Sequence, residues 1–574
     1  MPHYHISFQN PLSGYLQIKT TLQNISAPAL FLQLPAWRPG RYELQNFAQK
    51  LQGFAVTAPD GSPLPFRKVT KDRWRVDTQG HSRIEVHYNF FARQMDAGGS
   101  WLAPDFLYVN PVNCLLTAEG QEQEPCTLSL DLPADWQIAC GLPQTEPHTL
   151  VARDFDHLVD SPFMASATLQ HQVYEEQGIP FHVWFQGDCR PDWDKLLPHF
   201  RAFTREQLAL FETFPVPDYH FLNLILPYAH YHGVEHLNST VITLGPAEKL
   251  MQPDLYKELL GVSCHELFHT WNIKQIRPKE MLPYDFTREN YFRTGYVAEG
   301  VTTYYGDYLL ARSGVFTADQ YFQELDTVIK RHTADQGEKN LSVADSSFDT
   351  WLDGYKAGIP DRKVSIYHKG CLAALVLDLE IRKVTQNTRS LDDVMRRMWQ
   401  DFGQRGIGYT EEDYQRLAEA VAGVPLEQYF QEMIFGTAPF EEWLAPALEH
   451  VGCRLEKLPS PLAYESLYGF RLNPAPSVTP VISYLAPESP AAEVLSVDDE
   501  LVALNGRKLE NNNLPNLMAL QAEVELTLFR QKKLHTVSLA PDGKLHLPVY
   551  KVSRNPAATP AQRGNFKLWL KQDF

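Results

Sequence analysis

Residues 264–272 read Cys-His-Glu-Leu-Phe-His-Thr-Trp-Asn and contain the spacing His-Glu-x-x-His that zinc peptidases use. On a helix, His265 and His269 lie one turn apart on the same face, so two imidazoles can bind one metal ion. Glu266 lies about 100° further round the axis, where its carboxylate can act on a water molecule beside the metal. Pro278 is predicted to end this helix. The alternative is a surface helix with two solvated histidines, and the rest of the chain decides between the two.

The composition excludes several classes of function. A chain of 574 residues is too long for one domain, and three or four are expected. Its content of 44% hydrophobic and 12% aromatic residues is typical of a globular protein. The formal net charge of −17 offers no basic excess to neutralise phosphates, so no nucleic-acid partner is expected. Seven scattered cysteines without a CxxC pair indicate reduced thiols, and no apolar run reaches the roughly 18 residues that span a bilayer. Because the first residues also lack a signal peptide, we expect a cytoplasmic protein with no membrane partner.

The first 170 residues are predicted to form a β-sandwich domain. Apolar and polar side chains alternate in Tyr15–Leu22, in Ile84–Tyr88 and in residues 126–132. Proline and glycine separate these segments, and short strands at such spacing are typical of two packed sheets. The domain is expected to support the catalytic part or to form one wall of its cleft.

Helix patterns dominate residues 171–445, which are predicted to form the catalytic domain. They begin with a helix over 193–214, and an apolar strand over 219–226 interrupts them. From 446 to 545 prolines break any helix and short strands return, while 546–574 form a basic, irregular tail. The predicted fold class is therefore multidomain α+β.

A zinc site of this kind needs a third protein ligand and one position left for water. Glu289 follows His269 after 19 intervening residues, a gap that many two-helix zincins use, but it lies in a polar connector. Glu299 follows after 29 residues, inside a predicted helix that begins at Tyr296 and ends near Gly314. A second rigid helix can hold a carboxylate against the first, whereas capping or solvation is enough to explain the other glutamate. Spacing favours Glu289 and local structure favours Glu299.

Two stretches resemble those of a known family. His265–Lys274 resembles the extended zinc helix of the glycyl aminopeptidase family, gluzincins that carry a PDZ module, and residues 298–305 resemble its third-ligand helix. The resemblance implies a thermolysin-like, mainly α-helical catalytic domain in which Glu299 completes a Zn²⁺ site. Residues 34–42 and 160–162 resemble the family's β-domain. More distantly, the chain resembles aminopeptidase N and leukotriene A4 hydrolase.

Two further motifs, on the same resemblance, imply an aminopeptidase site. Residues 232–236, His-Gly-Val-Glu-His, resemble the superfamily strand that pairs with the substrate backbone. Gly233 and Glu235 are the matching positions, and the glutamate of that strand binds the free amino terminus, as a carboxylate suits a cation. The residues on either side of Glu235 differ from the superfamily's Met and Asn. Tyr367, in Tyr-His-Lys-Gly, resembles the tyrosine that donates a hydrogen bond to the tetrahedral oxyanion.

The C-terminal part of the chain resembles a PDZ module. Residues 489–506 follow its order of a short helix, an acidic turn, a strand and an Asn-Gly turn. Upstream, Tyr468, Gly469 and Phe470 are the candidate loop whose backbone N–H groups bind the carboxylate of a peptide C-terminus. The alternative is a packing domain without a ligand.

The sequence therefore predicts a zinc aminopeptidase that removes the N-terminal residue from peptides, with Glu266 and Tyr367 as catalytic residues. The family resemblance implies small first residues such as glycine or alanine. The expected partners are peptides with a free N-terminus and, at the PDZ-like module, a peptide C-terminus. A zinc endopeptidase is one alternative, and a PDZ scaffold protein with an inert zinc site is the other.

Overall fold

The computed structural model describes residues 1–356, 358–473, 479–509, 514–518 and 523–574. The chain forms two compact units: the first comprises residues 1–316, 347–356 and 389–425, and the second comprises residues 317–346, 357–388 and 426–574. Helices and several sheets occur in both, so the multidomain α+β class is confirmed. Among the described residues, none of the helices combines the length and the apolar character that a membrane crossing requires.

Three sheets build the first part of unit 1. They share a large apolar core that runs from Tyr4 to Ala165. The predicted strand Tyr15–Leu22 is present as β2, and the strand predicted from residue 126 is β12. The first sheet has the strand order β14 (Gln144–Glu146), β15 (Thr149–Ala152), β12 (Cys126–Leu130), β1 (His3–Ser7), β2, β7 (Ile84–Phe91), β4 (Leu51–Thr57). The second has the order β13 (Gln137–Cys140), β16 (Phe163–Ser166), β10 (Phe106–Val109), β9 (Ser100–Ala103), β8 (Arg93–Gln94). The third has the order β11 (Thr117–Ala118), β3 (Ala29–Gln33), β6 (Arg73–Asp77), β5 (Phe66–Thr70).

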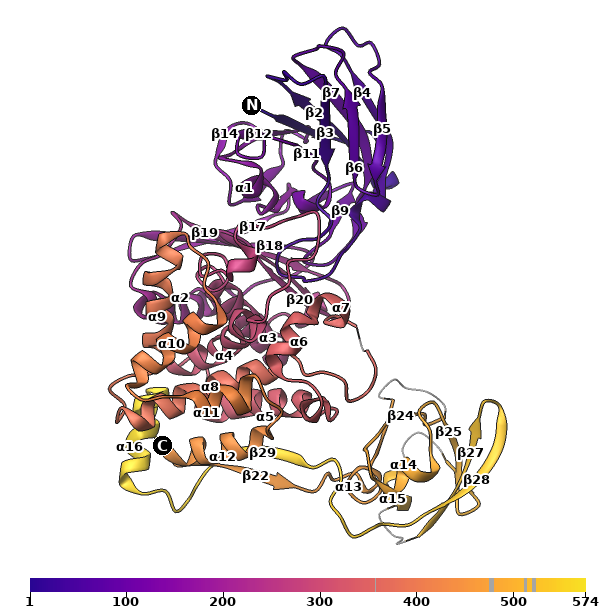
Figure 1. Ribbon diagram of the computed structural model, residues 1–574, viewed down its shortest axis with the longest axis vertical. Coiled ribbons are helices and arrows are strands. Elements are labelled where there is room, and N and C mark those ends of the chain that lie inside the picture. The colour runs from indigo at the N-terminus through magenta and orange to yellow at the C-terminus, as the bar shows by residue number, and fades with distance from the viewer. Residues whose placement is uncertain (357, 474–478, 510–513, 519–522) are drawn as a thin grey trace. The chain divides into compact units, whose positions relative to one another are not determined.

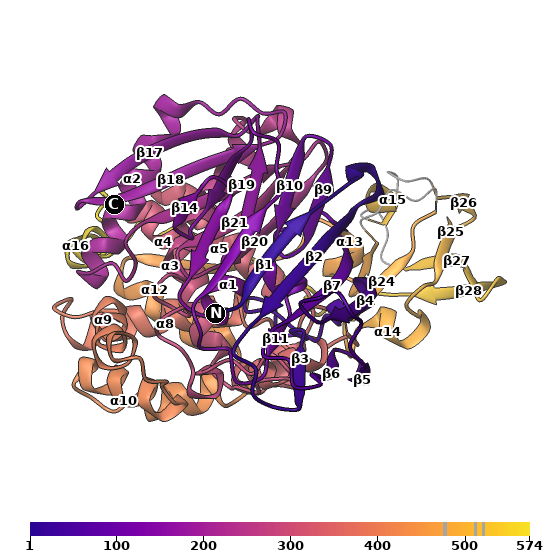
Figure 2. The ribbon, with the colours of Figure 1, turned by 90° about the horizontal axis from the view of Figure 1, so that it is seen from above.

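A fourth sheet of unit 1 carries the strand with the predicted amine-binding glutamate. Its order is β17 (Gln170–Glu176), β18 (Ile179–Gln186), β19 (Tyr219–Ile225), β21 (Ser239–Gly245), β20 (His230–Glu235), and its strands lie side by side in Figure 2. Every residue of β19 is buried, as expected for a strand that is parallel to both neighbours. Strand β20 is antiparallel to β21 at the sheet edge, so one side of its backbone is available for pairing.

The helices of unit 1 include the zinc helix, which is shorter than predicted. Helix α3 ends at Phe268, well before Pro278, and the chain continues in turns in which the Ile276 N–H donates to the Trp271 carbonyl. The carbonyl of Asn272 accepts a side-chain hydrogen bond instead, which removes it from the helical pattern. The helix predicted from Tyr296 is present as a π-helical turn followed by α4. The helices are α1 (Phe155–Val159), α2 (Trp193–Phe211), α3 (Pro253–Phe268), α4 (Thr302–Arg312), α7 (Thr350–Asp353), α9 (Leu391–Asp401) and α10 (Glu411–Ala422).

Unit 2 joins a helical part to a smaller part with a core of its own. Strands β22 (Cys453–Leu458) and β29 (Val549–Arg554) form a ribbon that leads to α13 (Figure 1). Beyond it, described residues between Ala463 and Leu539 form a separate apolar cluster. The other elements are α5 (Ala318–His332), α8 (His368–Val384), α11 (Glu427–Tyr429), α12 (Phe440–His450), α13 (Ala463–Ser466), α14 (Pro490–Val494), α15 (Leu514–Met518), α16 (Pro560–Leu570), β23 (Phe470–Leu472), β24 (Ile482–Leu485), β25 (Glu500–Leu504), β26 (Arg507–Lys508), β27 (Val524–Arg530) and β28 (Lys533–Leu539). Helix α6 (Val343–Phe348) spans the point where the chain passes between the units.

Candidate active site

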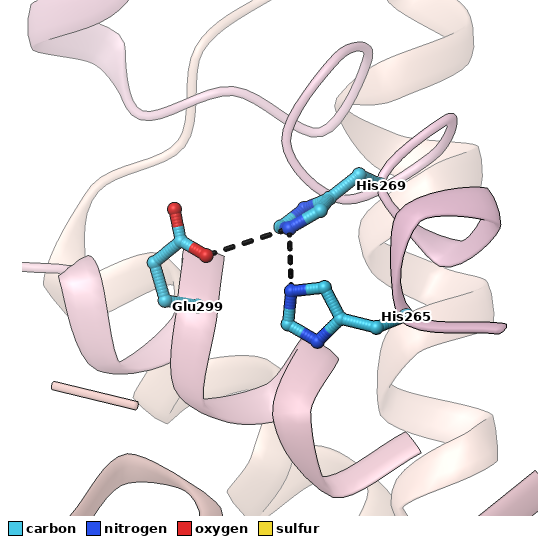
Figure 3. A group of neighbouring side chains, drawn as sticks. All are labelled: His265, His269 and Glu299. Carbon is cyan, nitrogen blue, oxygen red and sulfur yellow. Dashed lines mark hydrogen bonds and ion pairs between the residues drawn. The ribbon is translucent and has the colours of Figure 1, made fainter. Parts of the chain in front are cut away.

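Helix α3 and the π-helical turn before α4 bring three possible metal ligands together, as Figure 3 shows. Nε2 of His265 lies 3.0 Å from Nε2 of His269, which lies 3.4 Å from Oε2 of Glu299. The donors of a tetrahedral zinc ion are about 3.3 Å apart, because Zn–N and Zn–O distances are about 2.0–2.1 Å. The three side chains therefore fit a zinc ion both in donor type and in spacing.

The turn after α3 orients one of these histidines. Nδ1 of His269 lies 2.7 Å from the carbonyl oxygen of Asn272, which can only accept a hydrogen bond. The proton is thus held on Nδ1, and the lone pair of Nε2 faces the other two donors. The side-chain amide of Asn272 also donates to the Val297 carbonyl at 2.9 Å. One asparagine therefore ties the zinc helix to the segment that carries Glu299.

Glu299 is held from both sides, whereas the competing glutamate lies elsewhere. Glu299 is 2% exposed, and its Oε1 accepts a hydrogen bond from the Tyr42 hydroxyl at 2.9 Å. Among the described residues, Glu289 belongs to neither of the groups of side chains that could hold a metal ion. Of the two glutamates weighed from the sequence, only Glu299 lies beside both histidines.

Two further carboxylates adjoin the three donors. Oxygens of Glu235 and Glu266 lie within 4.8 Å of each other and of a ring nitrogen of His269. Both carboxylates are buried, and neither Oε1 of Glu235 nor Oε2 of Glu266 has a hydrogen-bond partner among the described residues. The backbone of β20 passes close to them, since a Cβ added to Gly233 would lie 2.2 Å from Oε1 of Glu266. Buried anionic oxygens without donors form a site that a cation or a proton donor would satisfy.

The carboxylates of the group favour positive charge at His269. Burial alone would lower the pKa of His269, but the carboxylates of Glu299 and Glu235 outweigh it and raise that pKa to about 10. The same cluster would stabilise a metal cation in place of the proton. Burial raises the pKa of Glu266 well above its usual range, Glu235 and Glu299 add to the effect, and His269 opposes it. A carboxylate of raised pKa takes up a proton more readily than an ordinary glutamate, as the role of general base requires.

A second buried network fixes the residue next to Glu235. Oδ1 of Asp160 lies 3.1 Å from Nδ1 of His236, and its Oδ2 lies 2.8 Å from Nζ of Lys274. Burial would raise the pKa of Asp160, but Lys274 and His236 lower it to about 2, so the carboxylate stays ionised. The network joins the N-terminal region, the residue that follows β20 and the turn after α3, and so anchors the chain beside Glu235.

Two protein-family domains match parts of the chain that contribute residues to this site. The Peptidase M61 N-terminal domain matches residues 3–167, and the M61 glycyl aminopeptidase domain matches residues 258–373. The chain carries the two domains of the M61 glycyl aminopeptidase family. The resemblance inferred from its motifs is thereby confirmed. The M61 peptidase match includes His265, Glu299 and Tyr367.

Two solved structures match this chain to different extents. An aminopeptidase N family protein from Idiomarina loihiensis is 26% identical, with a TM-score of 0.90, and the match covers 99% of this chain and 100% of that one. An M1 zinc metallopeptidase from Deinococcus radiodurans is 14% identical, with a TM-score of 0.48 over 76% of this chain and 94% of that one. A comparison with curated proteins finds no match.

The remaining predicted site residues belong to unit 2. Tyr367 immediately precedes α8, and its role at the oxyanion stays a prediction. In the part predicted to be a PDZ module, the Gly469 N–H donates to the Glu465 carbonyl at 3.1 Å, and the side chains of Tyr468 and Phe470 on either side in the sequence are buried. Carboxylate binding by this loop also stays a prediction.

The roles of three residues around the site were not predicted from the sequence. Tyr42 ends the Trp-Arg-Pro-Gly-Arg-Tyr segment, whose family likeness indicated a β-domain and no contact with a metal ligand. Asn272 stands three residues after His269, a spacing from which a carbonyl can reach the ring. Lys274 is a lysine in a segment of buried residues, and such a lysine requires a carboxylate partner.

Proposed function

We propose that this M61 family member is a zinc-dependent aminopeptidase that hydrolyses the first peptide bond of its substrates. One observation carries the proposal: the buried Glu235 carboxylate lies beside Glu266 and His269, and its Oε1 has no partner in the part of the chain that the structure describes. A substrate with a free amino terminus brings an ammonium group that satisfies this oxygen. An endopeptidase substrate has a neutral amide there and would leave the carboxylate unpaired.

His265, His269 and Glu299 would hold the Zn²⁺ ion. When bound, zinc supplies Lewis-acid chemistry, because it makes a water molecule acidic and polarises a carbonyl group. Glu266 accepts a proton from the attacking water at its unpartnered Oε2 and then donates it to the leaving amine. Its raised pKa suits the first of these transfers.

Glu235 fixes the substrate at its amino terminus, so the scissile bond follows the first residue. The edge of β20 offers backbone groups to the substrate, and Gly233 leaves room between this strand and Glu266. On the motif resemblance, Tyr367 donates a hydrogen bond to the oxyanion, and the first residue is small, such as glycine or alanine. The PDZ-like part of unit 2 is proposed to take a peptide C-terminus.

The test compares a glycine arylamide with its N-acetylated form, using zinc-loaded protein. The wild type should hydrolyse the free amine at least 100-fold faster, because acetylation removes the charge that Glu235 binds. Glu235→Gln should lower kcat/KM for the free amine about 100-fold and leave the zinc content unchanged, while Glu289→Gln serves as the control. Equal rates on both substrates would indicate an endopeptidase and contradict the proposal.

A further inference from the structure

The two carboxylate oxygens of Glu299 have different partners. Oε2 faces the histidines and lies 3.4 Å from Nε2 of His269 (Figure 3). Oε1 points to the N-terminal region, where it accepts the hydrogen bond of 2.9 Å from the Tyr42 hydroxyl. A carboxylate can bind a metal through one oxygen or through both. The hydroxyl on Oε1 leaves Oε2 as the oxygen that is free for a metal.

Aromatic packing holds the Tyr42 ring in place. Its centroid lies 4.9 Å from that of Phe292 and 6.2 Å from that of Trp351, and the residue is 1% exposed. The Tyr42 N–H donates to the Tyr355 hydroxyl at 3.4 Å. Because ring and backbone are both fixed, the hydroxyl is presented to Oε1 without a further loss of rotamer freedom.

The loop that carries Tyr42 is itself anchored to the chain between the zinc helix and α4. The Trp37 indole donates to the Asp285 carbonyl at 2.7 Å, and the Ala36 N–H donates to the Phe286 carbonyl at 2.8 Å. Trp37 and Tyr42 share one apolar cluster with Ile273 and Ala298, neighbours of the ligands in the chain. The N-terminal β region is therefore joined to both ligand-bearing segments.

We propose that Tyr42 is a positioning residue for the third zinc ligand: its hydroxyl holds Glu299 in a one-oxygen binding geometry and so raises the affinity for zinc. The inference rests on the proposed function only in taking zinc as the metal. Without the hydroxyl, Oε1 is left buried with no donor, and the carboxylate is free to rotate about its terminal bond. Loss of a hydrogen bond that orients a ligand typically weakens metal binding about 10- to 100-fold.

The test measures the zinc dissociation constant of the full-length chain by competition with a chromogenic chelator. Tyr42→Phe keeps the ring and removes the hydroxyl, and we expect zinc to bind it about 10- to 100-fold more weakly than the wild type. Tyr4→Phe is the matched control, because Tyr4 is also 1% exposed and its hydroxyl also donates over 2.9 Å, to the Leu116 carbonyl. Both variants should unfold at similar urea concentrations when metal-free.

Results other than this selective loss of zinc affinity would contradict the inference. Zinc affinity of Tyr42→Phe within twofold of the wild type would show that the hydroxyl does not position the ligand. Equal losses in the two variants, or a Tyr42→Phe chain that does not fold while Tyr4→Phe does, would make the hydroxyl a structural group. A wild-type chain that binds no zinc would overturn the proposed function as well, whereas tight and equal binding by wild type and Tyr42→Phe overturns the inference alone.

Discussion

Gly40 lies directly against the carboxylate of Glu235: a Cβ added to Gly40 would be 2.4 Å from Oε2. The φ angle of Gly40 is +77°, in the left-handed region that favours glycine. A turn of the N-terminal β region thus closes one side of the site proposed to bind the substrate amine. This contact explains why a residue of the β region would influence chemistry on β20 and α3.

Gly40→Ala is predicted to impair catalysis beyond its effect on stability. The new methyl group must displace the Glu235 carboxylate, so kcat/KM on a glycine arylamide should fall at least tenfold. Gly61→Ala is the matched control, since Gly61 has a φ of +85° and no atom of the described residues lies within 4 Å of the added Cβ. Both variants should lose about 1 kcal/mol of unfolding free energy from backbone strain, measured by urea titration. Equal kcat/KM values in the two variants would contradict the role given to the contact.

Replacement of each of the two candidate third ligands, Glu299 and Glu289, should show which of them binds zinc. Glu299→Ala removes one of three donors and should weaken zinc binding at least 100-fold, as measured by metal content after dialysis against a weak chelator. Glu289→Ala should retain one zinc ion and the wild-type rate, because Glu289 lies outside the donor group. Loss of zinc from Glu289→Ala with retention in Glu299→Ala would reverse the assignment.

A buried histidine outside the candidate metal-binding groups should make the fold sensitive to acid. Burial lowers the pKa of His220 to about 3, and the neighbouring rings of His182 and His171 add to the effect. The carboxylate of Asp218, 3.7 Å from Nε2 of His220, acts in the opposite direction but is one-third exposed to water. Because the ordinary histidine pKa is about 6.5, the unfolded chain binds one more proton than the folded chain between pH 6.5 and 3. Stability is therefore lost as the pH falls through this window.

The size of this effect can be measured by substitution. His220 should account for a loss of about 2 kcal/mol in unfolding free energy between pH 7 and pH 5. His220→Gln does not titrate and can still accept the hydrogen bond that the Trp184 indole gives to the ring at 3.2 Å. Its stability, followed by urea unfolding, should fall by about 2 kcal/mol less than that of the wild type over the same interval. An identical pH dependence in both proteins would contradict the prediction.

Local patterns in the sequence predicted the elements that local forces determine. The alternation in Tyr15–Leu22 gave strand β2 with its bounds, and the apolar run from Tyr219 is the fully buried strand β19. The end predicted for helix α3 was wrong because Asn272 forms hydrogen bonds with the ring of His269 and with the carbonyl of Val297. Such a tertiary competitor cannot be read from helix propensity or from the position of a proline.

In the candidate site too, residues close together in the sequence were predicted, whereas contacts between distant residues were not. His265, Glu266 and His269 share one helical turn, so their spacing alone predicted their chemistry. The bond from Tyr42 to Glu299 joins residues 257 positions apart, and neither periodicity nor a motif indicates such a pair. The family resemblance supplied Glu299, but the residues that hold it in place required the structure.

The central claim is tested most directly by the rate of Glu266→Gln on a glycine arylamide, with one zinc ion per chain verified beforehand. The substitution keeps the shape of the side chain and the three donor residues, so zinc should stay bound. The account predicts a fall in kcat of at least 100-fold, because the amide cannot take the proton from the attacking water. Hydrolysis at the wild-type rate by the zinc-loaded variant would contradict the account.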